Sequence, residues 1–360
     1  MKSSKWALGA AIAALFSAAD AANRDDIDVA HYEPLLRVEM RTIDAAAANA
    51  TERPGSAATT LMQFNAMGRS FDLELEPNSR LMRAAAQNPA LAGVDIYRGT
   101  LAGREGSWAR IVIVDGVPRG MFFDGEEHFA IEAPGDSVVA TDAPVVFRLA
   151  DATIAPGAMS CGNADHAMAA STAAQALLGE LHEAAEAQGA VSEIQVGAVG
   201  DFEFTSARGG DANAAADITT RLNNVDGIFS AQVGVQISVQ VIETFDTNSD
   251  PFTTSDAGAL LEELSDYRST NPAQNSNGLT HLYTGRDLDG STVGIAWTGA
   301  LCSNYFGTGV SEGNGSATFD TLIAKVNQKG VTDRKAHFRE VRASLEKEAT
   351  DLVERLNKLG

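Results

Sequence analysis

Residues 292–302 of the chain read TVGIAWTGALC, and this stretch decides how the C-terminal half of the sequence is interpreted. It has no charged side chain and is rich in small and β-branched residues, which favours a strand within a sheet. Three more strands are predicted upstream, and helices alternate with them. The strands are expected at Glu193–Phe204, Val235–Phe245 and Gly278–Thr284, and the helices at Asp211–Gln232 and at Ser255–Tyr267 with Ser255 as its cap. This alternation predicts an α/β unit with a largely parallel sheet and packed helices.

The preceding half has a different pattern, in which short alternating runs and turn signals take the place of helices. Turns such as Asp115-Gly116 and Asp124-Gly125 separate these runs. The runs are Leu36–Ile43, Phe71–Leu75, Val94–Tyr97, Trp108–Val114, Met121–Phe123, His128–Ile131 and Val145–Leu149. Residues 22–150 are therefore predicted to form a β-rich domain of the sandwich or barrel type.

The N-terminus has the layout of a secretory signal peptide. Lys2 and Lys5 precede the apolar run Trp6–Ala19, and Ala19-Asp20-Ala21 offers a small-x-small cleavage site. The run is too short for a mature membrane anchor, and no other stretch has the roughly 18 apolar residues of a transmembrane helix. We expect residues 1–21 to be removed and the protein to be secreted or extracellular, without a membrane span.

The charge of the chain is uneven. The net charge of −21 disfavours nucleic acid as a partner, because phosphates would be repelled. Lysine is absent between Lys5 and Lys325, whereas residues 325–360 hold 9 basic and 6 acidic side chains, so they are net +3 and the first 324 residues are net −24. The last segment therefore differs in composition from the rest.

Apolar side chains in this last segment recur at steps of three and four residues, as on one face of a helix. They are Phe338, Val341, Leu345, Ala349, Leu352, Leu356 and Leu359. Thr332 is suited to cap the start, so a charged amphipathic helix is predicted over residues 332–359. Such a helix either docks on its own protein or associates with a partner or a second copy, and the pattern leaves both open.

Residues 151–191 are predicted to be a connector. They include the helical stretch Ser171–Gln188, in which His182, Glu183 and Glu186 form a HExxE string. A metal site would need a second histidine, so this string is interpreted as solvated helix surface. Cys161 also lies here, and whether it bonds to Cys302, the other cysteine of the chain, is left open.

The histidines do not form a metal or catalytic motif. The six are His31, His128, His166, His182, His281 and His337, and no two are four residues apart on a helix. His281 lies within an apolar strand, where a core histidine is the simpler interpretation. A GxSxG elbow, a P-loop and a CxxC pair are absent from the sequence.

The stretch at residues 292–302 resembles the edge-strand signature of reprolysin-type (ADAM-like) metzincins, and Gly309–Glu312 continues it. The likeness extends over residues 192–324. It implies the N-terminal part of a metzincin-like zinc metalloendopeptidase domain with a mixed, largely parallel sheet. The substrate, a peptide or protein, would then pair with the strand. The residues implied to bind it are Val293, Gly294, Ile295, Ala296 and Trp297.

The β-rich domain is similar to the propeptide of the same proteases, through residues 71–78, 97–103 and 107–132. Cys161-Gly162 lies where such precursors place a cysteine switch, whose thiolate occupies the fourth zinc position. The resemblance therefore implies a zymogen. An ordinary free or bonded cysteine remains the alternative for Cys161.

The chain departs from the family after Ser316–Ala324. In the family the next residues form a helix with HExxHxxGxxH, but here Lys325–Gly330 contain neither an imidazole nor a carboxylate. We therefore expect no catalytic zinc and no cleavage by this chain, and assign no catalytic or metal-ligating residue. Residues 325–360 are interpreted as an unrelated segment, either a genuine fusion or an artefact of the gene model. The resemblance pairs Cys302 with a cysteine that is absent here. A non-catalytic pseudoprotease that binds peptides along residues 292–302 is the alternative function.

Overall fold

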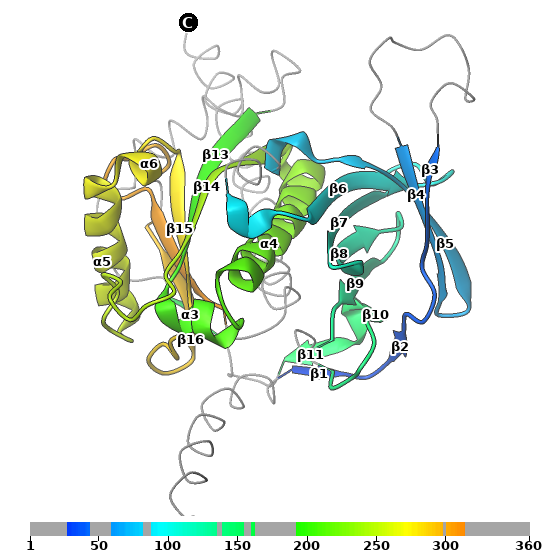
Figure 1. Ribbon diagram of the computed structural model, residues 1–360, viewed down its shortest axis with the longest axis horizontal. Helices are drawn as coiled ribbons and strands as arrows, with labels where there is room; N and C mark the ends of the chain where they lie inside the picture. Colours follow the sequence, from blue (N-terminus) through cyan, green and yellow to red (C-terminus); the bar gives the residue numbers. More distant parts are fainter. Residues whose placement is uncertain are drawn as a thin grey trace, which may run out of the picture. The chain divides into compact units, whose positions relative to one another are not determined.

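The computed structural model describes residues 27–43, 59–81, 88–134, 139–154, 160–162, 192–297 and 300–313. The chain divides into two units, residues 1–318 and 319–360, and all described residues belong to the first. The signal peptide, the connector helix at Ser171–Gln188 and the helix expected over residues 332–359 lie outside the described residues. Two larger sheets and four α-helices make up the described part (Figure 1).

The N-terminal strands form one antiparallel sheet of nine strands, in the order β2-β10-β9-β8-β7-β6-β5-β4-β3. Their bounds are β2 Tyr32–Pro34, β3 Glu39–Ile43, β4 Thr59–Ala66, β5 Arg69–Pro77, β6 Val94–Leu101, β7 Trp108–Val114, β8 Val117–Phe123, β9 His128–Glu132 and β10 Val145–Arg148. A small second sheet pairs β1, Ile27–Val29, with β11, Ala152–Ile154. Asp115 and Gly116 join β7 to β8 with φ of 51° and 79°, as a tight two-residue hairpin requires.

These strands form a single sheet that ends at β2 and β3, so the predicted sandwich is wrong. The sheet curls as the barrel-like alternative predicts, because Phe71 of β5 and Phe129 of β9 meet although three strands lie between them. One face carries its own aromatic core, in which the Phe71 ring lies edge-on to the Phe122 and Phe129 rings at centroid distances of 5.0 and 5.2 Å. On the other face, Ile96 and Val112 pack with residues of a helix from the C-terminal half. That helix covers the face of the sheet opposite its aromatic core.

The C-terminal strands form a six-stranded sheet in the order β12-β16-β17-β15-β13-β14. Their bounds are β12 Ser160–Gly162, β13 Ser192–Gly200, β14 Val235–Thr244, β15 Leu279–Thr284, β16 Thr292–Ala296 and β17 Thr308–Glu312. The pairs β13–β14, β13–β15, β15–β17 and β12–β16 are parallel, and β16–β17 is antiparallel.

Two predicted strands end earlier than expected. β13 stops at Gly200, because Asp201 accepts the Phe204 amide at 2.7 Å and starts α3, Phe202–Ala207. β16 stops at Ala296, and Cys302 lies in a turn with a φ of 62°. In both places the strand ends at a local helix cap or turn, although the sequence pattern that predicted the strand continues.

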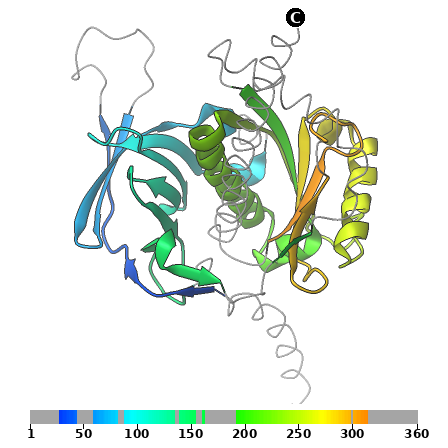
Figure 2. The ribbon, with the colours of Figure 1, turned by 180° about the vertical axis from the view of Figure 1, so that it is seen from behind.

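Helix α4, Asp211–Val233, contacts both sheets, packing on β13 and β14 and on β6, β7 and β8 (Figures 1 and 2). It ends at Gly234 in the left-handed conformation. On the opposite face of the six-stranded sheet, α5, Ala257–Thr270, packs on β16 and β17 and leads into α6, Pro272–Asn275. The cap of α5 is Asp256, which accepts the Ala259 amide at 2.7 Å, and not Ser255 as predicted.

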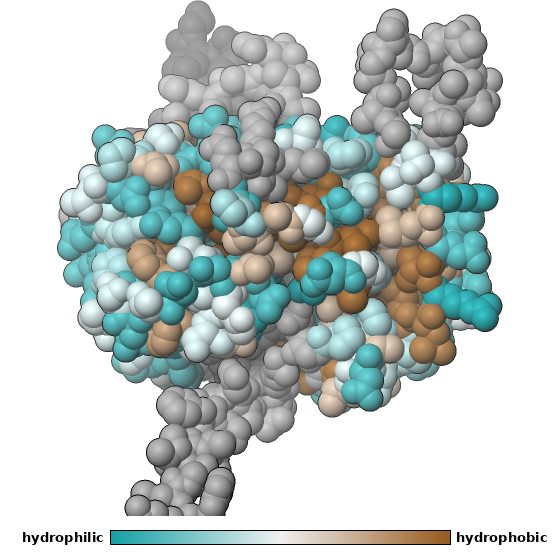
Figure 3. Space-filling model, in the orientation of Figure 1, coloured by the Kyte–Doolittle hydropathy of each residue, from teal (hydrophilic) through white to brown (hydrophobic). Residues whose placement is uncertain are grey.

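The surface differs between the two halves. Hydrophilic residues predominate over α5, and hydrophobic residues gather over the nine-stranded sheet (Figure 3). Exposed large apolar side chains in that sheet region include Tyr32, Leu36 and Met40. In the described part of the chain, no helix combines the length and the apolar character needed to cross a membrane.

Candidate functional site

The five residues implied to bind substrate lie on β16 and directly after it. The side chains of Val293 and Ile295 are buried against the α5 side of the sheet, whereas Gly294 and Trp297 are half-buried and Ala296 is exposed. On one side β16 pairs with β17, with Gly294 opposite Ser311. Only the backbone on the other side of β16 is therefore available to a further strand.

That side of β16 is already paired with β12. Ser160 lies opposite Thr292, Cys161 opposite Gly294 and Gly162 opposite Ile295, in parallel register with one irregularity. The resemblance implies that a substrate pairs with this strand, but a segment of the same chain occupies its backbone groups from Thr292 to Ile295. The candidate cysteine-switch segment and the candidate peptide-binding strand are thus brought together by the fold.

An aromatic cluster continues from the end of β16. The Trp297 ring lies edge-on to Phe306 at 5.1 Å, and Phe306 contacts Tyr305 at 4.9 Å. The Trp297 indole donates to Ser265 Oγ at 3.0 Å, which fixes its orientation against α5. Phe306 is 47% exposed, so the cluster presents an apolar surface beside the strand.

His281 and Ser311 face the side of the sheet opposite α5. Nε2 of His281 lies 3.0 Å from Ser311 Oγ, and the imidazole contacts the Tyr283 ring. Burial, and to a lesser extent the nearby Arg221 guanidinium, lower the pKa of His281 to about 4. The imidazole is therefore neutral at pH 7 and bonds to a strand neighbour, as the core interpretation predicts.

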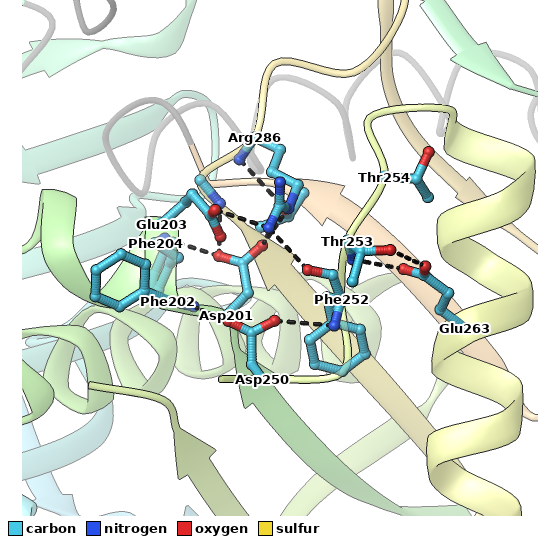
Figure 4. Close-up of polar contacts among 12 residues, drawn as sticks. Asp201, Phe202, Glu203, Phe204, Asp250, Phe252, Thr253, Thr254, Glu263 and Arg286 are labelled. Atoms are coloured by element: carbon cyan, nitrogen blue, oxygen red, sulfur yellow. Dashed lines mark hydrogen bonds and ion pairs between the residues drawn. The ribbon is translucent and has the colours of Figure 1, made fainter. Parts of the chain in front are cut away.

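A second polar cluster lies at the carboxyl ends of β13, β14 and β15, where ligands often bind in parallel sheets (Figure 4). Asp201 accepts bonds from the amides of Phe204 and Gly285 and from the Thr284 hydroxyl. Asp250 accepts the amides of Phe202 and Phe252. These carboxylates bind loop amides of their own chain, so the cluster joins loops and does not present free ligands.

Arg286, in the loop after β15, contacts the other members of this cluster. It forms a 2.7 Å ion pair with Glu203, donates to the Phe252 carbonyl at 2.7 Å and lies 4.0 Å from Asp201 (Figure 4). Burial raises the pKa of Asp201 to about 6, and the three hydrogen bonds only partly offset it. Asp201 was not predicted as a site residue, because it lies inside a stretch predicted to be a strand.

Helix α4 carries two buried charge clusters that sequence analysis also missed. Asp226, wholly buried, accepts from Arg80 at 3.0 Å, from Arg110 at 2.8 Å and from the Ile237 amide at 2.9 Å. Arg110 belongs to β7 and Ile237 to β14, so one carboxylate joins the two sheets through α4. An aspartate directly after Val225, in a helix expected to pack on a sheet, would have been a usable signal, because a charge on a buried helix requires a partner.

The other buried cluster lies closer to the N-terminus of the same helix and is centred on Asp217. Asp217 pairs with Arg208 at 2.8 Å and with Arg221 at 3.1 Å. Burial opposes ionisation of Asp217, but the two guanidinium groups outweigh it and hold its pKa below the usual value. Arg221 also lies over the Phe204 and Tyr283 rings, at 6.0 and 5.9 Å. The positive charge of Arg221 is therefore balanced by Asp217 and by the faces of these two rings.

The described residues do not fit a zinc ion. Among them, no three histidine, cysteine, aspartate or glutamate side chains come together as a metal-ligand group. His31, His128 and His281 belong to separate parts of the two halves, and His281 is bonded to Ser311. Catalytic zinc needs three protein ligands and an open position, which the described residues do not supply.

Cys302 is a free, exposed thiol. Its amide donates to the Gly278 carbonyl just before β15, whereas Cys161 pairs with Gly294 of β16, and β17 lies between β15 and β16. Strands are about 4.8 Å apart, so the two cysteine backbones lie beyond the usual span of a disulfide.

Residues 215–333 match the model of the reprolysin-like metallopeptidase family M12B. This segment resembles the reprolysin-like metallopeptidases. The matched residues include most of α4 and all of β14, α5, β15, β16 and β17, and therefore the whole candidate peptide-binding strand. The match covers a third of the chain and continues past Ala324 to residue 333. The reprolysin-like family is zinc-dependent and acts on peptides or proteins.

Among solved structures, the chain is similar to the crystal structure of metalloproteinase-II from Bacteroides fragilis. The two are 9% identical with a TM-score of 0.37, over 71% of this chain and 75% of the other. A comparison of the chain with curated proteins finds no match.

Proposed function

We propose that the chain is the secreted precursor of a reprolysin-like zinc metalloendopeptidase, and that it cleaves no peptide bond as it stands because it lacks the zinc-binding helix. Residues 1–21 are the signal peptide, 22–150 a propeptide-like domain and 151–191 a connector. Residues 192–324 are the N-terminal part of a metzincin-like protease domain, and 325–360 a segment that departs from its zinc-binding motif, although the family match runs on to residue 333. The family match over residues 215–333 supports the protease descent.

One observation carries the proposed inactivity. The six residues Lys325–Gly330 follow Ala324 without an imidazole or a carboxylate, at the place where the resemblance implies HExxHxxGxxH. A metallopeptidase needs ligands for zinc and a carboxylate that activates water. Without these side chains the edge strand would position a peptide but not cleave it.

Zinc content and casein cleavage of the purified full chain test this proposal. We expect less than stoichiometric zinc and no cleavage that a chelator suppresses. The variant Cys161→Ala separates a missing site from a latent one, since a switch cysteine keeps an intact zinc site inactive. Chelator-sensitive cleavage by either protein, or by Cys161→Ala alone, would contradict the proposal.

A second function is favoured by the pairing of β12 with β16. A strand that accepts an extended segment of its own chain offers the backbone groups that bind an added peptide strand. The alternative is a pseudoprotease that captures peptides there, with the aromatic cluster of Trp297, Tyr305 and Phe306 beside the bound peptide.

A fluorescent peptide with the sequence of residues 157–165 tests this alternative. Cys161→Pro removes a backbone donor from β12 and should raise saturable binding of the peptide, because it frees β16. The matched control Thr153→Pro lies in β11, outside this sheet, and should leave binding unchanged. Equal binding by the original chain and both variants would rule out capture at β16.

A further inference from the structure

The strand β3 forms one end of the nine-stranded sheet (Figure 1). Among the described residues it pairs with β4 alone, with Met40 opposite Met62. In an antiparallel pair, alternate residues bond to the neighbouring strand, and the others direct their N–H and C=O groups away from it. The outer side of β3 therefore offers backbone groups to a further strand.

The side chains along this edge are exposed. They are Glu39, Met40, Arg41 and Thr42. Of the five exposed large apolar side chains in the described part of the chain, three lie within residues 32–40. They are Tyr32, Leu36 and Met40, and Leu36 is 78% exposed. The edge thus combines available backbone groups with apolar side chains that a partner would remove from water.

A second copy of the chain has the same strand to offer. Two identical strands related by a twofold axis run antiparallel, and each residue makes the same contact from both sides. Residues that lie opposite each other must direct their backbone groups alike, because they either exchange both hydrogen bonds or exchange none. This condition is met only when the axis passes beside one residue, which then lies opposite its own copy.

The charges of β3 distinguish between the possible axes. With the axis at Met40, Glu39 lies opposite Arg41 of the second copy, and Arg41 lies opposite its Glu39. An axis at Arg41 would place two arginines opposite each other, and an axis at Glu39 would place two glutamates there. Opposite charges in facing positions stabilise a strand pair, whereas like charges destabilise it. The charge pattern therefore favours the axis at Met40.

We propose that β3 is a dimerisation strand that pairs with β3 of a second copy, antiparallel and about a twofold axis at Met40. Glu39 and Arg41 form two symmetric ion pairs, and the two Met40 side chains meet at the axis. Because only residues 38–42 of each copy pair, the interface is small and the dimer dissociates on dilution. The pairing involves the N-terminal sheet alone and is independent of the proposed protease descent.

Charge reversal in the full-length chain tests this pairing. Sedimentation should show a monomer–dimer equilibrium for the original chain. Glu39→Arg places arginines opposite each other at both pairs, and Arg41→Glu places glutamates there. Each variant alone should therefore raise the dissociation constant about tenfold or more. An equimolar mixture of the two variants restores opposite charges at both pairs and should dimerise as the original chain does.

Matched variants separate this effect from a general effect of charge. Arg104→Glu and Glu105→Arg make the same changes in the exposed turn between β6 and β7, and they should leave the dissociation constant unchanged. Three results would each overturn the proposal: an original chain that stays monomeric, a dimer that charge reversal leaves intact, or a mixture that dimerises no better than the single variants.

Disulfide cross-linking tests the position of the axis. In a Cys302→Ser background, Met40→Cys places two thiols at the axis, with Cβ atoms about 5 Å apart, and should give a covalent dimer on oxidation. Thr42→Cys places them about 13 Å apart along the strands and should give no more dimer than the background chain. Equal cross-linking by the two variants would contradict an axis at Met40.

Discussion

Nε of Arg110, in the nine-stranded sheet, donates to the carboxylate of Asp226 in α4 at 2.8 Å, and both side chains are buried. Burial lowers the pKa of Arg110, and the Asp226 carboxylate counteracts this. Asp226 also accepts from Arg80 and from the backbone of β14. The relationship therefore couples elements that are more than 100 residues apart in sequence.

Asp226→Ala should destabilise the protein by about 3–5 kcal/mol, because it leaves two guanidinium groups buried without a counter-charge. Urea unfolding followed by circular dichroism measures the change. The ion pair of Arg98 with Glu76 is partly exposed, so the control Glu76→Gln should cost less than about 1 kcal/mol. A loss at Asp226 as small as that of the control would contradict a structural role for this cluster.

Gly227→Ala should also destabilise the protein, by about 1–3 kcal/mol, although alanine usually stabilises a helix interior relative to glycine. A Cβ at this position would lie 2.5 Å from the Trp108 ring and 2.8 Å from Cγ of Arg110. Thermal unfolding with tryptophan fluorescence monitors both the stability and the environment of Trp108. An unchanged or higher midpoint would show that α4 and β7 do not pack this closely.

Asp201 should make the protein less stable as the pH rises from about 4 through 6. Burial raises its folded pKa to about 6 from the model-peptide value near 3.8, so the folded state retains a proton that the unfolded state has lost. This contribution is full below pH 3.8 and is lost by pH 6, with an upper limit of about 3 kcal/mol. Asp201→Asn should flatten this part of the pH profile in urea unfolding, and a variant with the original profile would contradict the assignment.

His281 should act in the opposite direction. Its folded pKa is lowered to about 4 by burial, from 6.5, so below pH 6.5 the unfolded state takes up a proton that the folded state does not. Stability should therefore fall between pH 6.5 and 4, and His281→Gln should remove that decline. Titration of the imidazole by NMR gives the pKa directly, and a value near 6.5 would refute the prediction.

The amino-acid pattern anticipated elements well where periodicity was long and caps were local. The helix expected at Asp211–Gln232 spans Asp211–Val233, and the strand expected at Val235–Phe245 spans Val235–Thr244. β4, Thr59–Ala66, was missed because its polar residues interrupt the apolar alternation. The expected cap Ser255 was displaced by its neighbour Asp256, since either side chain is chemically able to cap.

Features that depend on distant partners could not be predicted. The pairing of β12 with β16 joins segments about 130 residues apart, and neither strand's composition specifies the other. The same holds for Asp226 and its two arginines, which only the tertiary fold brings together. The five candidate peptide-binding positions on and directly after β16 could be named from the sequence, because they lie in one short stretch.

The position of α4 between the two sheets has a consequence for cooperativity. Leu222 and Ala215 of the helix share one apolar cluster with Val112 of the N-terminal sheet and Val239 of the C-terminal sheet. If either sheet unfolds, the side of α4 that packs on it is exposed to solvent. The other sheet then loses part of the apolar layer that the shared cluster provides. The two halves, which sequence composition separates near residue 150, are thus joined as a single cooperative folding unit through one helix.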